Sequence, residues 1–182
     1  MRASAFVVGS GSTAGAGLIA LARSLGFSRV DPYSGIEIML ERAQSTPLIF
    51  LLCAAVPDVS KLKPIAKLLR SSPDYRLRFA PLIYFPPEPS IDTIKACIGM
   101  GFDDVIAMPY SGNDLGQRIG RQLGGTHVYY ETASYFGPDR RNRVGEERST
   151  DSDHGGGEYR RIEIRRSDAG IDVLSDEFEV VI

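Results

Sequence analysis

Two patterns of hydrophobic residues, one typical of strands and one typical of helices, alternate along the first 125 residues. Short, largely apolar runs typical of strands occupy residues 5–8, 47–53, 82–85 and 105–107, and residues 28–31 are interpreted as a further brief strand. Between them, apolar residues recur every three or four positions, as in helices, over residues 18–25, 35–43, 62–69, 91–98 and 115–123. The run 47–53 is apolar on both faces, which indicates a central parallel strand covered by helices on each side. Five strand–helix repeats predict a doubly wound α/β fold with a five-stranded parallel sheet.

The pattern changes after residue 125. Four large aromatic side chains come first, at Tyr129, Tyr130, Tyr135 and Phe136. A polar stretch rich in arginine and glycine then runs to Gly157, so we interpret residues 126–158 as an aromatic and Arg-rich linker. Because large rings are costly to leave in water, we expect them to dock on the domain formed by residues 1–125 or on a partner.

Residues 159–182 show a period of two. Apolar and charged residues alternate on both sides of a Ser-Asp-Ala-Gly turn at 167–170, which predicts a C-terminal β-hairpin. Arginines occupy the first half and acids the second, so opposite charges would pair across the strands. A lone hairpin is marginal in water, so we expect it to join a sheet edge of this chain or of a partner. An acidic tail without regular structure is the alternative.

Charge gives no reason to expect nucleic acid or an anionic membrane as a partner. The 21 Lys and Arg residues nearly balance the 23 Asp and Glu residues, for a net charge of -2. This balance conceals a split, since residues 1–125 carry 13 basic and 10 acidic side chains, whereas residues 126–182 carry 8 basic, all arginine, and 13 acidic. The split supports a domain boundary near residue 125.

The two cysteines indicate the cellular environment. Cys53 and Cys97 each lie in an apolar stretch and fit no metal-binding or redox spacing, so we expect free buried thiols in a reducing cytoplasm. No stretch approaches the roughly 18 apolar residues of a membrane span, and the N-terminal run is too short for a signal peptide. We therefore expect a cytoplasmic protein that requires neither a cofactor nor a metal.

Four short motifs follow one another in the first domain. They are Val7-Val-Gly-Ser-Gly-Ser-Thr13 with Leu25-Gly-Phe27 at the end of the following helix, Cys53-Ala-Ala-Val-Pro57, Gly101-Phe-Asp-Asp104 and Met108-Pro-Tyr110. In this order they resemble the landmarks of the CheY-like receiver domain of response regulators, over about residues 3–124. The resemblance implies the strand order 2-1-3-4-5 and a role in bacterial two-component signalling.

The resemblance also shows which reactive groups are replaced. The acidic pair that binds Mg²⁺ in a receiver reads Gly9 and Ser10 here, and the phosphoacceptor aspartate reads Cys53, so none of the three supplies a carboxylate. Where a receiver has the lysine that neutralises the phosphoryl group, this chain has Met108. Where a receiver has the Ser or Thr that hydrogen-bonds the phosphoryl group, this chain has Pro86, which has neither a hydroxyl nor an N–H group. We therefore predict a pseudo-receiver that is not an enzyme and is not phosphorylated on aspartate.

A scaffold without this chemistry favours a role in protein interaction. We expect a phosphorylation-independent adaptor that contacts a kinase, an effector or a second copy of itself as a homodimer. The candidate interaction residues are the position of the receiver's aromatic switch residue, the tyrosine of the Met-Pro-Tyr motif, two further aromatic residues and an arginine cluster. They are Val105, Tyr110, Tyr135, Phe136, Arg140, Arg141 and Arg143. The arginine cluster is typical of a solvated basic linker, although its guanidinium groups also suit phosphate or carboxylate.

Nucleotide or dinucleotide binding is the alternative function. Glycines at 9, 11, 15 and 17 between a strand and a helix resemble a dinucleotide-binding loop, and an acid ends the second strand, where it would reach a ribose. The candidate ligand residues are Gly9, Gly11, Ser12, Thr13, Gly15 and Asp31. Against this alternative, no second mononucleotide-binding half follows, and the chain has no Tyr-x-x-x-Lys pair.

Overall fold

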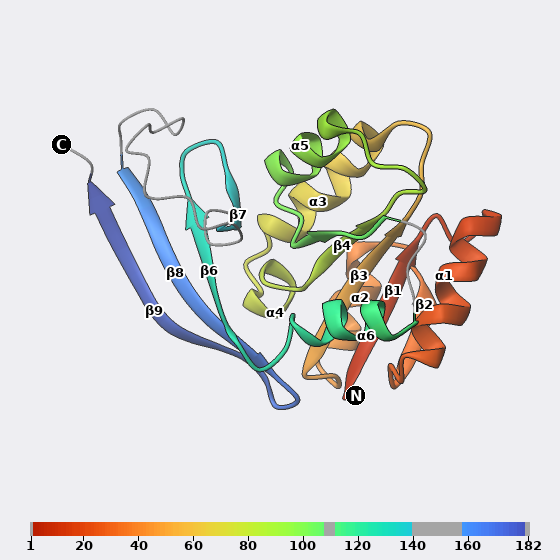
Figure 1. The fold of residues 1–182 in the computed structure, drawn as a ribbon. Coiled ribbons are helices and arrows are strands. Elements are labelled where there is room, and N and C mark those ends of the chain that lie inside the picture. The colour runs from red at the N-terminus through yellow and green to blue at the C-terminus, as the bar shows by residue number, and fades with distance from the viewer. Residues whose placement is uncertain (1, 108–111, 140–157, 181–182) are drawn as a thin grey trace.

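A five-stranded parallel sheet forms the centre of the protein (Figure 1). The computed structural model describes residues 2–107, 112–139 and 158–180. The sheet has the order β2-β1-β3-β4-β5, as predicted, and all of its strand pairs are parallel. Its strands are β1 (Ala3–Val8), β2 (Arg29–Pro32), β3 (Leu48–Ala54), β4 (Leu82–Phe85) and β5 (Asp104–Val105). Every residue of β3 is buried, as expected for a central strand.

Helices cover both faces of this sheet. Five of them match the predicted periodic segments: α1 (Thr13–Ser24), α2 (Ile36–Ala43), α3 (Lys63–Arg70), α5 (Ile91–Gly99) and α6 (Gly112–Gly120). Two single-turn elements, η1 (Val59–Leu62) and α4 (Tyr75–Arg78), are too short to produce a hydrophobic period. Among the described helices, none has the length and apolar content that a membrane crossing requires.

The alternation of side chains along β3 divides the interior into two layers. Phe50 and Leu52 face one layer, where α1 and α6 contribute buried side chains. Leu51 and Cys53 face the other layer, which contains buried residues of α2, α3 and α5. The doubly wound arrangement follows from this alternation, because each face of the strand needs its own cover.

A second, antiparallel sheet follows the parallel domain in sequence and lies beside it (Figure 1). Its order is β7-β6-β8-β9, with β6 (Thr126–Glu131), β7 (Phe136–Pro138), β8 (Glu158–Ser167) and β9 (Gly170–Val180). The predicted hairpin is present as β8 and β9, which pair from Ser167 and Gly170 outward. The strands β6 and β7 lie within the segment interpreted above as linker, and β6 joins the hairpin by pairing with β8.

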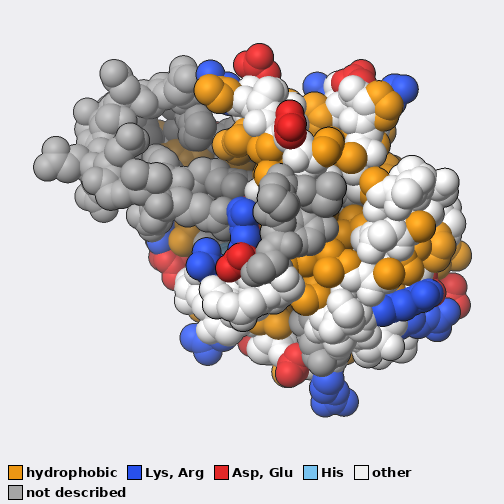
Figure 2. All heavy atoms as spheres, turned by 45° about the vertical axis from the view of Figure 1, so that its right-hand side comes forward, with side chains coloured by type: hydrophobic (Ala, Val, Ile, Leu, Met, Phe, Trp, Pro, Cys, Tyr) orange, Lys and Arg blue, Asp and Glu red, His pale blue; other side chains and the backbone are white. Residues whose placement is uncertain are grey.

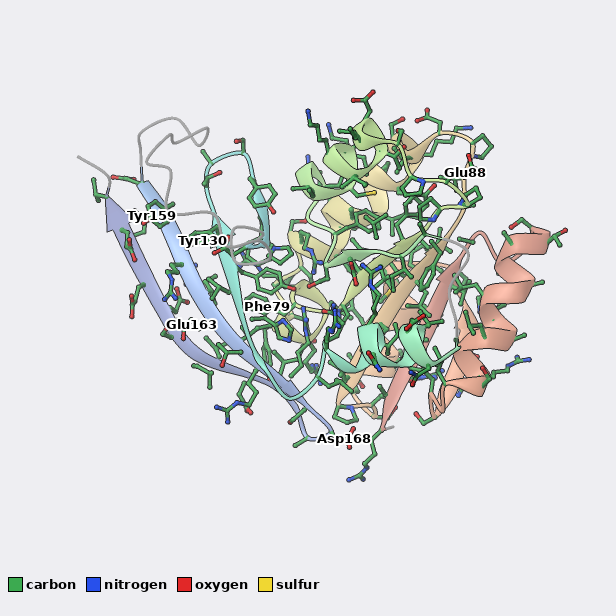
Figure 3. All side chains as sticks on the ribbon, in the orientation of Figure 1. Phe79, Glu88, Tyr130, Tyr159, Glu163 and Asp168 are labelled. Atoms are coloured by element: carbon green, nitrogen blue, oxygen red, sulfur yellow. The ribbon has the colours of Figure 1, made fainter. Side chains whose placement is uncertain are left out.

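The two sheets share one hydrophobic core. Tyr129 of β6 and Ile162, Ile164 and Ile171 of the hairpin are buried in the same cluster as the α1 and α6 face of the parallel sheet. Phe79 lies between the sheets (Figure 3), with its ring centroid 5.1 Å from that of Tyr129. The C-terminal sheet is therefore packed as an integral part of the fold.

Candidate functional site

The carboxyl edge of the parallel sheet holds several of the described residues expected to form the altered phosphorylation pocket. Gly9 and Ser10 follow β1 directly, and Val8 lies opposite Cys53 in the register of β1 and β3. Gly9 has a positive φ of 78°, and a Cβ atom added there would lie 3.5 Å from the Ala54 Cβ. The turn after β1 therefore closes onto the end of β3, as the parallel arrangement requires.

Cys53 occupies an apolar position at this edge. Its side chain is 1% exposed and lies in the cluster that contains Tyr84 and Cys97. Burial raises the pKa of the Cys53 thiol, and interaction with Cys97 raises it further, so the thiol stays protonated. A buried neutral thiol is neither a ligand for Mg²⁺ nor a ready nucleophile.

The other pocket positions are mostly apolar. Pro86 is buried after β4, and Val105 of β5 is partly buried. Tyr84 lies opposite Cys53 in the register, and its hydroxyl accepts a hydrogen bond from the Val56 N–H at 3.4 Å. The predicted positions Met108 and Tyr110 lie outside the described residues.

The carboxylate nearest to Cys53 in sequence is used locally. Asp58 accepts hydrogen bonds from the Ser60 backbone N–H at 2.9 Å and from the Ser60 hydroxyl at 2.8 Å, and thereby caps η1. These bonds lower the pKa of Asp58. Glu88 lies in the exposed loop after β4 (Figure 3). Within the described ranges, no three His, Cys, Asp or Glu side chains form a group that could hold a metal ion.

The glycine-rich loop is folded tightly against the start of α1. A Cβ atom at Gly15 would lie 2.0 Å from the Gly9 carbonyl oxygen, so this close approach requires glycine. The Ser12 hydroxyl accepts a hydrogen bond from the Gly15 N–H at 3.0 Å and caps α1, which begins at Thr13. By contrast, a Cβ atom at Gly11 would meet nothing within 4 Å.

Asp31, the candidate ribose ligand, is held by two arginines. Its Oδ2 atom lies 2.8 Å from the Arg29 Nε and 3.0 Å from the Arg42 Nη2. The arrangement ties β2 to α2 and neutralises the carboxylate. A ribose hydroxyl would have to compete with both guanidinium groups for this acceptor.

A buried ionic cluster at the opposite edge of the sheet was not anticipated from the sequence. Asp103 precedes β5, and its Oδ2 atom accepts hydrogen bonds from the Leu82 N–H at 2.8 Å and the Arg70 Nη2 at 2.6 Å. Its Oδ1 atom accepts from the Arg166 Nη2 at 2.8 Å and from the Tyr129 hydroxyl. Because Leu82 begins β4, this cluster marks the amino edge of the parallel strands.

The cluster contains two guanidinium groups and one carboxylate, all buried. Burial by itself would raise the pKa of Asp103, but Arg166 and Arg70, with hydrogen bonds from Tyr129 and Leu82, hold it well below its usual range. Burial raises the pKa of Tyr129, whose hydroxyl therefore remains a neutral donor.

Backbone carbonyl groups and a glutamine satisfy the remaining arginine donors. Arg70 donates to the carbonyl oxygens of Gly101, Arg78 and Ala80, at distances between 2.7 and 3.0 Å. Arg166 donates to the Phe79 carbonyl oxygen at 2.9 Å and to the Gln122 Oε1 at 3.0 Å. The cluster thus joins α3, β6 and β8 to the parallel sheet through hydrogen bonds made by both guanidinium groups.

The aromatic interaction candidates are partly engaged within the chain. The Phe136 ring packs 5.5 Å from that of Phe79, and the Arg78 guanidinium lies 4.2 Å from its centroid. Tyr135 is partly buried and donates to the Pro138 carbonyl oxygen at 3.4 Å. The candidates Arg140, Arg141 and Arg143 lie outside the described residues.

Solved structures that match this chain are response regulators and receiver domains, aligned over its N-terminal 65% or so. One is the receiver domain of a sensor histidine kinase from Pseudomonas aeruginosa with a magnesium ion in its active-site cleft, at 20% identity and a TM-score of 0.48, covering 65% of this chain and 95% of that one. Another is a putative response regulator from Chloroflexus aurantiacus, at 18% identity and a TM-score of 0.49, with the same coverage of 65% and 95%. A third is a response regulator from Desulfuromonas acetoxidans, at 24% identity and a TM-score of 0.44, covering 65% and 94%.

No family model matches the sequence, and no curated protein matches it significantly.

Proposed function

We propose that this chain is a receiver-like signalling module that acts through protein–protein interaction and without aspartyl phosphorylation. The observation that carries the proposal is the chemistry of the carboxyl edge, where Gly9, Ser10 and Cys53 lie at the ends of adjacent strands. Mg²⁺ prefers carboxylate oxygens, and an acyl phosphate forms only on a carboxylate. None of these three residues has a carboxylate, so they provide neither the ligands for Mg²⁺ nor the phosphoacceptor.

The surroundings of this edge support the same proposal. Asp58, the acid closest to Cys53 along the chain, is committed to the cap of η1. The side chain of Cys53 itself is enclosed in the core. No conformational step that depends on a phosphoryl group is therefore expected, and the module would present a constant surface to its partner.

Exposed apolar side chains support interaction with another protein. On α5, Ile91 is 71% exposed and Ile94 is 36% exposed. Figure 2 shows further apolar side chains exposed on one side of the molecule, interspersed with charged ones. Such surfaces favour association with a protein partner, which we propose is a kinase, an effector or a second copy of this chain.

Dinucleotide binding has less support from the geometry. The Gly15 position is explained by its close approach to the Gly9 carbonyl oxygen, and Asp31 is neutralised by Arg29 and Arg42. The Ser12 hydroxyl already accepts the Gly15 N–H that a phosphate would seek at the start of α1.

Titration with Mg²⁺ and beryllofluoride, a phosphoryl mimic, tests the proposal. We expect the amide resonances around Gly9 and Cys53 to be unchanged in a ¹H–¹⁵N NMR spectrum, because no carboxylate is present to bind either species. A saturable, Mg²⁺-dependent shift of these resonances would refute phosphorylation independence. Calorimetric titration with NAD⁺ and NADP⁺ is the parallel test, in which binding at micromolar affinity would favour the dinucleotide alternative.

A further inference from the structure

β9 is a long strand at the free edge of the antiparallel sheet. It runs for 11 residues, or about 37 Å at 3.4 Å per residue, and pairs with β8 along one side. In the described part of the chain, no strand pairs with its other side (Figure 1). Backbone N–H and C=O groups along such an edge are available to a further strand.

One face of β9 carries an uncovered apolar row. Val173 lies opposite Ile164 in the register and Phe178 lies opposite Arg160, so both share the face of β8 that turns toward the parallel domain. Ile164 is fully buried there, but Val173 is 47% exposed, Phe178 64% and Val180 58%. The apolar row therefore continues beyond the area that the parallel domain covers.

The opposite face of β9 is acidic. Asp172 lies opposite Arg165, and Glu177 lies opposite Arg161. Asp172 and Glu177 are exposed, and β9 contains no lysine or arginine. The apolar face also carries Asp176, which lies opposite Ile162 and forms an ion pair with Arg160 of β8 at 2.6 Å. The strand thus presents a mainly apolar face whose single acid is paired, and an opposite face on which Asp172 and Glu177 are exposed.

We propose that β9 binds an extended segment of a protein partner by strand addition, and that this segment alternates apolar residues with lysine or arginine. β8 provides a partial precedent within the chain, since Ile162 and Ile164 lie on the mainly apolar face, and Arg161 and Arg165 lie opposite Glu177 and Asp172 on the other face. Arg160, on the apolar face of β8, pairs with Asp176, the one acid of β9 on that face. A partner with the same alternation would continue both faces across the free edge. This inference rests on the proposed interaction function and specifies the chemistry of the partner.

Charge disfavours a second copy of β9 as the occupant. The strand carries four acids, Asp172, Asp176, Glu177 and Glu179, and no lysine or arginine of its own, and within the described residues only Asp176 is paired with a base of β8, so pairing two copies would set acids against acids. Like charges on neighbouring strands are destabilising. A basic segment removes this repulsion and gains attraction.

Fluorescence anisotropy with the full chain tests the inference. The probe is a labelled peptide of alternating arginine and valine, about eight residues long. One control peptide has the same composition with all arginines before all valines, and another alternates glutamate and valine. We expect the alternating basic peptide to bind at least about tenfold more tightly than either control, with affinity falling as salt is added. Equal binding of the two basic peptides, or no saturable binding at millimolar concentration, would overturn strand addition.

Charge reversal on β9 provides the matched comparison. The double variant Asp172→Lys with Glu177→Lys should bind the basic peptide about tenfold more weakly and gain affinity for the glutamate–valine peptide. The control variant Glu41→Lys with Glu88→Lys has the same net charge, changes exposed acids outside β9, and should bind like the unmodified chain. Circular dichroism verifies that both variants fold.

Two results would contradict the inference. If both double variants bind the basic peptide equally weakly, the peptide is attracted to the net charge of the chain alone. If analytical ultracentrifugation detects a dimer that dissociates when β9 is altered, the edge belongs to a second copy of the chain. These assays contain no Mg²⁺ and no phosphoryl mimic. Their failure would therefore refute strand addition and leave the phosphorylation-independent role to the beryllofluoride titration.

Discussion

Asp103 provides the carboxylate for two buried guanidinium groups at the contact between the sheets. Arg70 lies 2.6 Å from it and Arg166 lies 2.8 Å from it, and both arginine side chains are less than 5% exposed. A buried charge whose partner is removed is strongly destabilising, because its solvation in water is not replaced. The stability of the whole chain therefore depends on the ionised state of this one side chain.

We expect Asp103→Asn to lower the free energy of unfolding by about 3–5 kcal/mol at pH 7. The pKa of Asp103 is held well below its usual range in the folded protein and is about 3.9 when unfolded. The contribution of ionised Asp103 to the free energy of unfolding is therefore complete above about pH 5. It is lost as the pH falls through about 4 toward the lower pKa of Asp103 in the folded protein. The difference in the free energy of unfolding between the unmodified chain and Asp103→Asn should therefore be smaller at pH 3 than at pH 7, as measured by urea unfolding at both pH values.

Asp172→Asn is the control for this comparison. Asp172 is exposed, so its substitution should change the free energy of unfolding by less than about 0.5 kcal/mol. Parallel acid curves for the unmodified chain and Asp103→Asn would contradict the assigned role of Asp103.

At the scale of single elements, α1 shows how one glycine-rich segment contains residues with different constraints. Gly15 packs against the backbone of the preceding loop, and the Ser12 hydroxyl fixes the start of the helix. Gly17 lies on the exposed side of α1, whereas Gly15 is buried, and an added Cβ atom at Gly17 would meet nothing within 4 Å. The spacing of the glycines in the sequence does not distinguish these two environments.

We expect opposite effects from alanine at these two positions of α1. Gly15→Ala places a Cβ atom 2.0 Å from the Gly9 carbonyl oxygen and should destabilise the protein by about 1–3 kcal/mol or more. Gly17→Ala should stabilise it by about 0.5–1 kcal/mol, because alanine loses less backbone entropy in a helix. Urea unfolding of both variants measures the difference. Destabilisation of similar size in both would show that the close approach at Gly15 is not the cause.

At the scale of the whole molecule, the parallel domain and the antiparallel sheet depend on each other. Four side chains from the C-terminal sheet, those of Tyr129, Ile162, Ile164 and Ile171, are at most 5% exposed in the shared core. Burial of each contributes about 1.5–3 kcal/mol, or roughly 6–12 kcal/mol together. This is comparable to the 5–15 kcal/mol or so by which a typical domain is stable.

We therefore expect a fragment of residues 1–125 not to fold stably. The full chain should unfold in one transition, with coincident curves from far-ultraviolet circular dichroism and tyrosine fluorescence. A cooperative transition in the isolated fragment, or two separate transitions in the full chain, would show that the sheets are independent units.

The strands and helices of the parallel domain and the β8–β9 hairpin were predictable from the sequence because their signals are local, whereas the strand order was expected from the resemblance to receiver domains. The β3 run Leu48–Ala54 is apolar on both faces, and the turn between Ser167 and Gly170 separates two alternating segments. The strand β6 was not predicted, because its pairing brings Tyr129 opposite Ile162, far along the chain. α4 was missed because one turn is too short to show a period.

The candidate sites likewise divide into features with local signals in the sequence and features that depend on contacts between distant segments. The identities of Gly9, Ser10 and Cys53 show without any structure that these positions carry no carboxylate, and the resemblance to receiver domains led us to expect them at one edge of the sheet. The folded structure was needed to show that Arg70, Asp103 and Arg166 form one buried cluster and that β9 lies at the edge of the sheet within the described residues. Those features depend on contacts between distant segments, which local periodicity does not encode.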